Sequence, residues 1–141
     1  MHRILTIVAV AGLMLALGAT AAFADGSQTT TPTSKQKAGI VKAWNGGKAV
    51  SSSKLKCYTV AISKGNKVWA GLMFNTKASG CSASAFDGSA LLWGSGSSWN
   101  LLTEGSDLPA GTCTALASVL GPNGWVDLVN YASGLGCQNI D

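Results

Sequence analysis

Histidine and arginine are missing from the sequence after its third residue, because His2 and Arg3 are the only residues of these types. Histidine is the usual general acid–base residue and the commonest ligand of zinc and copper. A Ser-His-Asp triad or a Cys-His dyad is therefore excluded as a catalytic site. We expect no metal and no cofactor. Arginine is the favoured bidentate partner of guanine and phosphate, so its absence argues against nucleic acid as a partner.

Short motifs for catalysis or nucleotide binding are also scarce. The sequence contains no G-x-x-x-x-G-K-[ST], no G-x-G-x-x-G and no EF-hand spacing. One S-x-x-K string runs from Ser51 to Lys54, but the partner strings S-D-N and K-T-G are absent. Glu104, Asp107 and Asp127 could supply paired carboxylates for a small hydrolase, which ranks third among our functional hypotheses. We expect that the protein is not an enzyme.

The chain begins with the pattern of a secretory signal peptide. The basic MHR is followed by an uncharged apolar run from Ile4 to Leu17 and by Ala22-Phe23-Ala24, an A-x-A cleavage pattern. The apolar run is shorter than the ~20 residues that span a bilayer. We therefore predict that residues 1–24 are removed. The protein is then secreted, free or associated with the cell wall, without membrane contact after cleavage.

The remaining chain has the length of one domain. Residues 25–33, DGSQTTTPT, are polar and predict a disordered tail, and residues 34–141 predict a single domain. The four cysteines, an even number in an exported chain, indicate two disulfides. Three pairings are possible, and the order of the predicted elements favours Cys57–Cys81 and Cys113–Cys137.

Apolar periodicity predicts an α+β fold with an N-terminal helix, a four-stranded antiparallel β-meander and two short C-terminal helices. The first two strands carry apolar residues on both faces, which we interpret as a sheet covered by helices on one side. Leu116, Val119 and Leu120 are expected to form a buried stripe. The predicted elements are a helix over 35–44 capped by Ser34, strands over 55–63, 67–75, 90–93 and 99–103, and helices over 112–122 and 124–133.

Two of the five tryptophans flank the glycine–serine connection GSGSS, which predicts a hairpin with a five-residue loop. Trp93 and Trp99 could pair across the two strands or serve as stacking platforms for a ligand. We favour packing, and expect one of the two in the core and the other half-exposed.

Charge is distributed unevenly along the chain. All nine lysines after the leader fall between Lys35 and Lys77, whereas the acidic residues other than Asp25 follow them. Such asymmetry is typical of a basic face for an anionic surface, although lysines can also merely solubilise a tail and a helix. The candidate binding residues are Trp93, Trp99, Lys35, Lys42, Lys54 and Lys56.

Two functional hypotheses follow from these features. The first is a secreted, non-enzymatic module that binds a cell-wall polymer or an extracellular protein partner. The alternative is an inhibitor of an extracellular hydrolase, a protease or a lysozyme, which presents the disulfide-fixed loop Lys77 to Asp87. A preorganised loop loses little entropy when it docks into an enzyme cleft.

The sequence resembles a loose group of small exported proteins from high-GC Gram-positive bacteria. The resemblance rests on the leader, the lysine-rich helix, the strand segment Val68 to Gly71, the segment SWNLLTEGS from Ser98 to Ser106, and Cys113 before a short helix. It spans roughly residues 38–121. It implies export and a similar arrangement of helix and sheet, and it implies no activity and no functional residue.

Overall fold

The computed structural model describes residues 28–81 and 88–137, so the predicted signal peptide lies outside the described residues. Five antiparallel strands form one meandering sheet in the order β1-β2-β3-β4-β5. One strand more than predicted is therefore present. The strands are β1 (Thr29–Thr30), β2 (Tyr58–Ser63), β3 (Trp69–Phe74), β4 (Ser89–Ser95) and β5 (Ser98–Gly105).

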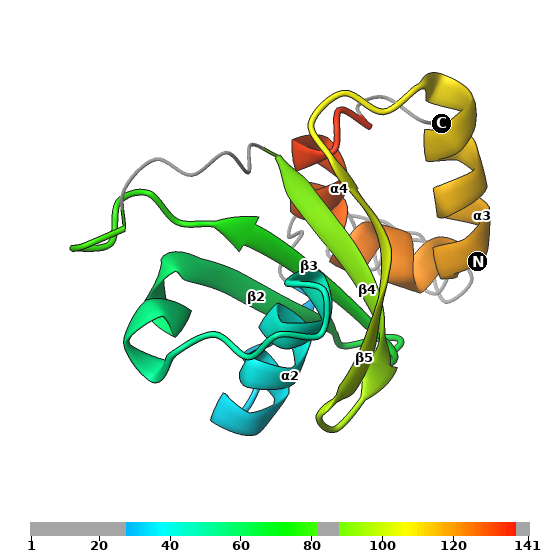
Figure 1. Ribbon diagram of the computed structural model, residues 1–141. Coiled ribbons are helices and arrows are strands. Elements are labelled where there is room, and N and C mark those ends of the chain that lie inside the picture. Colours follow the sequence, from blue (N-terminus) through cyan, green and yellow to red (C-terminus); the bar gives the residue numbers. More distant parts are fainter. Residues whose placement is uncertain (1–27, 82–87, 138–141) are drawn as a thin grey trace, which may run out of the picture.

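Helices cover both faces of this sheet. Helix α2 (Ser34–Trp44) packs on one face, and α3 (Ala110–Asp127) and α4 (Val129–Gly134) pack on the other (Figure 1). A short 3-10 helix, η1 (Ser52–Cys57), leads into β2. The α+β class is confirmed, but the expectation of helices on one side only is wrong. Because β2 and β3 carry apolar side chains on both faces, each face needs its own cover.

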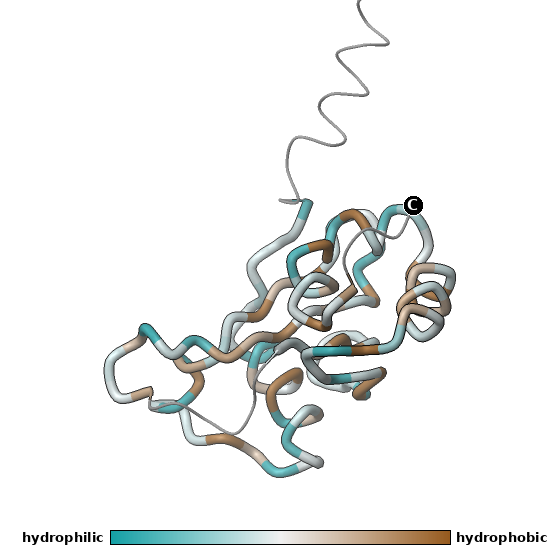
Figure 2. The backbone as a smooth tube through the Cα atoms, turned by 90° about the horizontal axis from the view of Figure 1, so that it is seen from above, coloured by the Kyte–Doolittle hydropathy of each residue, from teal (hydrophilic) through white to brown (hydrophobic). Residues whose placement is uncertain are grey.

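Two hydrophobic cores result from this layering. In Figure 2 the apolar, brown segments fall mainly in the strands and helices, whereas polar, teal segments occur both in these elements and in the connections. The core under α2 contains Ile40, Val41, Val60, Ile62, Ala70, Leu72, Ala90, Leu92 and Trp99. The core under α3 and α4 contains Leu91, Cys113, Leu116, Leu120, Leu128, Tyr131, Ala132, Leu135 and Cys137.

The extra strand lies in the segment 25–33 that composition predicts as a disordered tail. Thr29 pairs with Ser63 on β2, and the Lys64 backbone N–H donates to the Gln28 carbonyl at 2.8 Å. Thr33, not Ser34, caps α2, because its hydroxyl accepts from the N–H of Gln36, whose side chain accepts from the N–H of Thr33. The folded domain therefore begins earlier than predicted.

The β4–β5 hairpin is tighter than the sequence suggests. Ser95 pairs with Ser98, so the turn has two residues rather than five, and Gly96 adopts a left-handed φ of 57° that suits such a turn. The register shifts by one residue near Leu91 and Leu92, which leaves Leu102 as the extra residue of a β-bulge.

The break between the two predicted C-terminal helices is found where the sequence predicts it, because Gly121 has a non-helical φ of 71° inside α3. The second predicted helix, 124–133, is in addition divided at Leu128, where α3 ends and α4 follows. Helix α3 starts at Ala110, two residues before the predicted range 112–122. Leu116 and Leu120 are buried, whereas Val119 is 55% exposed and does not belong to the stripe. Residues advance by about 100° around a helix, which turns Val119 away from the face shared by Leu116 and Leu120.

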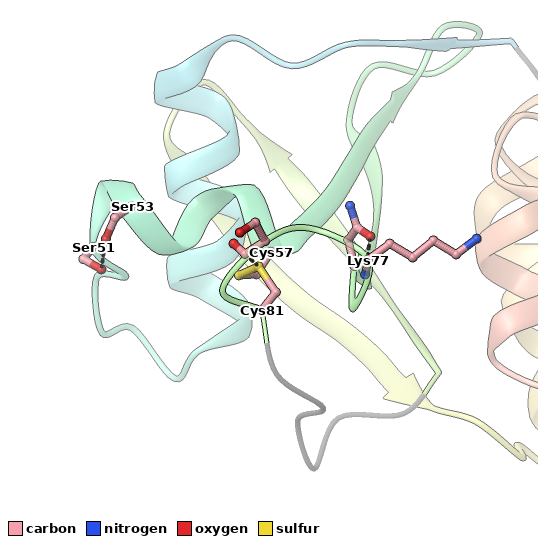
Figure 3. Close-up of a disulfide and its surroundings, with 7 residues drawn as sticks. Ser51, Ser53, Cys57, Lys77 and Cys81 are labelled. Atoms are coloured by element: carbon pink, nitrogen blue, oxygen red, sulfur yellow. Dashed lines mark hydrogen bonds between the residues drawn. A yellow bond between two sulfur atoms is a disulfide. The ribbon is translucent and has the colours of Figure 1, made fainter.

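The two disulfides join the pairs that the element order favours. Cys57–Cys81 connects the end of η1 to the loop after β3 (Figure 3), and Cys113–Cys137 connects α3 to the segment after α4. Such bonds are compatible with a secreted protein. Among the residues that the structure describes, no helix has both the length and the apolar character needed to cross a membrane.

Candidate functional site

Six of the nine described lysines lie on α2, η1 and the connection between them. These two elements contact each other, and five of the six side chains are exposed. We call this surface the lysine face. Its members are Lys35, Lys37, Lys42, Lys48, Lys54 and Lys56. The four lysines that we selected as candidate binding residues therefore lie, exposed, on two elements that contact each other.

Acidic side chains do little to neutralise the lysine face. Residues 28–81 and 88–137 contain nine lysines but only Glu104, Asp107 and Asp127 as acids. Glu104 is the one that reaches α2, and its Oε2 accepts a 2.6 Å hydrogen bond from Trp44 Nε1. Asp127 belongs to the opposite side of the sheet, because it lies in α3. The described part of the chain therefore carries a strong positive charge.

A row of aromatic rings lies beside the lysine face. The rings of Trp44 and Tyr58 have centroids 5.4 Å apart, and those of Tyr58 and Phe74 are 5.5 Å apart in an edge-to-face arrangement. All three side chains are partly buried, and burial raises the pKa of the Tyr58 hydroxyl. We did not select these residues from the sequence. The alternation of β2 and β3 carries the signal, since Tyr58 and Phe74 are direct cross-strand partners.

Trp99 meets Lys42 in a shallow groove. The groove has a volume of about 290 Å³ and lies between α2 and the β4–β5 hairpin. Trp99 is only 8% exposed, and its Nε1 donates to the Gly96 carbonyl at 2.9 Å. Its ring is therefore mainly a core element. The groove is lined by Gly39, Lys42, Ala43, Gly47, Ser97, Ser98, Trp99 and Asn100.

Trp93 is separated from Trp99 and from the lysine face. It is 48% exposed and lies directly opposite Trp69 on β3 and Asn100 on β5. Because directly paired residues share a face, Trp93 lies on the α3–α4 side, with Trp69 packed on that core. One tryptophan of the pair is thus in the core and the other half-exposed, as expected. The two do not pair across the hairpin and cannot form a common platform.

The S-x-x-K string lies on the surface. Ser51 precedes η1, and its hydroxyl lies 3.4 Å from the Ser53 hydroxyl on the outer side of that helix (Figure 3). Ser51 and Lys54 are both exposed, and the Lys54 backbone N–H donates to the Ser51 carbonyl at 2.9 Å. A serine activated by lysine begins a buried helix, which is not the environment found here.

The three candidate carboxylates do not converge. Glu104 faces α2, Asp107 is exposed in the connection from β5 to α3, and Asp127 is buried on the other side of the sheet. Within the described ranges, no group of three or more histidine, cysteine or acidic side chains is arranged to hold a metal ion.

The loop of the inhibitor hypothesis is only partly described. Cys81 is tied to Cys57, while residues 82–87 lie outside the described residues. The Lys77 side chain extends away from η1 (Figure 3).

Comparison with known proteins gives no relative of this chain. No protein-family model, no curated protein and no solved structure matches it. The functional argument therefore rests on the residues and the geometry described above.

Proposed function

We propose that the protein is an exported, disulfide-stabilised binding module that holds an anionic polymer of the cell wall on its lysine face. The observation that carries this proposal is the collection of six lysines on α2, η1 and their connection, where Glu104 is bound by Trp44. Exposed ammonium groups attract a polyanion over a distance of about 10 Å at ordinary ionic strength, and binding releases its counterions.

Lysine is well suited to this task. Its ammonium group is a flexible point charge, whereas arginine would favour planar, bidentate recognition of particular groups. A surface of lysines therefore recognises charge density along a polymer more than the identity of a repeat unit. The aromatic row of Trp44, Tyr58 and Phe74 beside the lysines offers apolar edges for the polymer's sugar or glycerol units.

Two triple variants with equal loss of charge test the proposal. The first, Lys42→Gln with Lys54→Gln and Lys56→Gln, removes half of the lysine face. The second, Lys64→Gln with Lys67→Gln and Lys77→Gln, removes the three lysines outside it. Each is titrated with fluorescently labelled poly(glycerol phosphate) over a range of salt concentrations, with binding followed by fluorescence anisotropy.

We expect the wild-type affinity to fall steeply with salt. The first variant is expected to reduce the slope of log K against log salt by roughly two to three, because each lysine contact contributes about 0.7 to 0.9 to that slope. The second variant is expected to keep most of the slope. Equal losses in both variants, or no binding of the wild type at low salt, would reject the lysine face as the binding surface.

A further inference from the structure

A second pocket lies apart from the lysine face, where β1, the β2–β3 turn and the end of α3 meet. Its volume is about 400 Å³, within the ~300 to 1,000 Å³ typical of small-molecule sites. None of its lining residues belongs to the lysine face. They are Gln28, Lys64, Gly65, Pro122, Asn123, Val126 and Asp127.

The wall of this pocket contains a buried carboxylate. Asp127 is only 5% exposed, which makes it the one buried charged side chain in residues 28–81 and 88–137. Its Oδ2 accepts from the Ser63 hydroxyl at 2.6 Å and from the Gly65 backbone N–H at 2.8 Å. Both donors are neutral, and both bind the same oxygen. A buried carboxylate is costly unless a cation compensates its charge.

The other lining groups define what kind of cation fits. Lys64 supplies a positive charge, Gln28 and Asn123 supply amides, and Pro122 and Val126 supply apolar surface. A ligand that places an ammonium group at Asp127 can thus place a carboxylate or carbonyl toward Lys64 and a short aliphatic group on the apolar wall. Free amino acids combine these features.

We propose that this pocket binds a primary ammonium group on an amino-acid-sized ligand, with the Asp127 carboxylate as its counter-ion. This proposal is independent of polymer binding. The ammonium can come from a free amino acid or from the protein itself. Gln28 lines the pocket only three residues after Asp25, the expected first residue after cleavage.

The test follows the backbone amide signal of Gly65 by NMR in the protein that begins at Asp25. Alanine amide is the probe, and N-acetylalanine amide, which has no ammonium group, is the control ligand. Where the chain's own α-amino group does not fill the pocket, we expect alanine amide to shift the Gly65 signal saturably and the acetylated compound to leave it unchanged. Asp127→Asn keeps the hydrogen-bond acceptor but removes the charge, so it is expected to weaken binding at least tenfold.

A second variant keeps the test valid if the Asp127 variant folds poorly. Val126→Trp adds bulk to the apolar wall of the pocket and leaves the Asp127 carboxylate unsubstituted, and it is expected to abolish the response to alanine amide. Equal binding of both ligands, or unchanged affinity in both variants, would overturn the proposal.

A chain lengthened by Gly-Ser-Gly-Ser ahead of Asp25 distinguishes the two sources of ammonium. If the chain's own α-amino group occupies the pocket, this extension itself shifts the Gly65 signal and opens the site to alanine amide. If a free ligand is the natural occupant, both chains bind alanine amide equally. The absence of any response in either chain would refute the site.

Discussion

At the scale of single residues, two fully buried serines differ in their hydrogen bonding. Ser63 donates to Asp127 and its hydroxyl also accepts from the Asn66 backbone N–H at 3.0 Å. Ser89 is equally buried, but among the described residues its hydroxyl has no partner. A buried polar group without a partner costs free energy, whereas a satisfied one contributes to stability.

These serines form a matched pair for mutation. We expect Ser63→Ala to lower the free energy of unfolding by about 1–3 kcal/mol, because the buried Asp127 carboxylate loses one of its two donors and the Asn66 N–H loses its acceptor. Ser89→Ala is expected to leave stability unchanged or to raise it by up to about 1 kcal/mol. Urea denaturation measures both. A larger loss in Ser89→Ala than in Ser63→Ala would contradict the hydrogen-bond assignment.

Tyr131 makes stability depend on alkaline pH. Burial raises the pKa of its hydroxyl to about 12 from the ordinary value of 10.0. The folded state favours the neutral form, so this contribution is complete below pH 10 and is lost as the pH rises through 12. It amounts to about 2–3 kcal/mol.

Tyr131→Phe removes the titrating hydroxyl and keeps the lysines. A comparison of its stability with that of the wild type therefore separates the ionisation of Tyr131 from that of the lysines. Between pH 9 and pH 12 the wild type is expected to lose more stability than the variant, as followed by urea denaturation at each pH. Parallel loss in both proteins would show that Tyr131 ionises freely in the folded state.

At the scale of elements, α4 depends on a glycine in the sheet. A Cβ atom on Gly71 of β3 would lie 2.3 Å from the Tyr131 ring, so this ring packs directly on the bare backbone of the strand. Gly71→Ala is expected to cost about 1–3 kcal/mol through overpacking. Gly111→Ala in α3 is the control, because its Cβ would meet no atom within 4 Å. Denaturation that ranks Gly111→Ala as the more damaging change would exclude this packing.

Helices and strands were predicted correctly where the apolar residues are regularly spaced. They were missed where local hydrogen bonds determine the secondary structure. The alternation of β2 and β3 and the Gly121 break in α3 could be read directly. The strand Thr29–Thr30 could not, because its pairing with β2 depends on backbone groups and not on apolar side chains. The bulge at Leu102 was also not predicted. Leu101 and Leu102 are adjacent apolar residues, so the sequence does not show which of them is left unpaired in the strand.

The candidate site was predictable only in part. Lysines close in sequence remain close on α2 and η1, so their grouping follows from the chain order. Trp93 and Trp99 were chosen together, and the tight turn and pairing register place them on opposite faces. The pocket at Asp127 brings together residues from Gln28 to Asp127, a combination that no local pattern reveals.

At the scale of the whole molecule, the two disulfides should contribute similarly to stability. Each closes a loop with a sequence separation of 24, for which the chain-entropy model gives about 3 kcal/mol. We expect no free thiol in Ellman titration of the unfolded, unreduced protein. Replacement of either cysteine pair by serine should lower the thermal midpoint by more than about 10 °C. Two reactive thiols in the unreduced protein would contradict this framework.

The surface proposed to hold an anionic polymer is the lysine face on α2 and η1. The most direct measurement is an NMR titration of the ¹⁵N-labelled protein with short poly(glycerol phosphate) chains at low salt. We predict that amide signals of residues 34–57 shift together and saturably, while those of the β2–β3 turn and α3 stay in place. Shifts centred on the β2–β3 turn or α3, or no shift anywhere, would show that the lysine face does not bind the polymer.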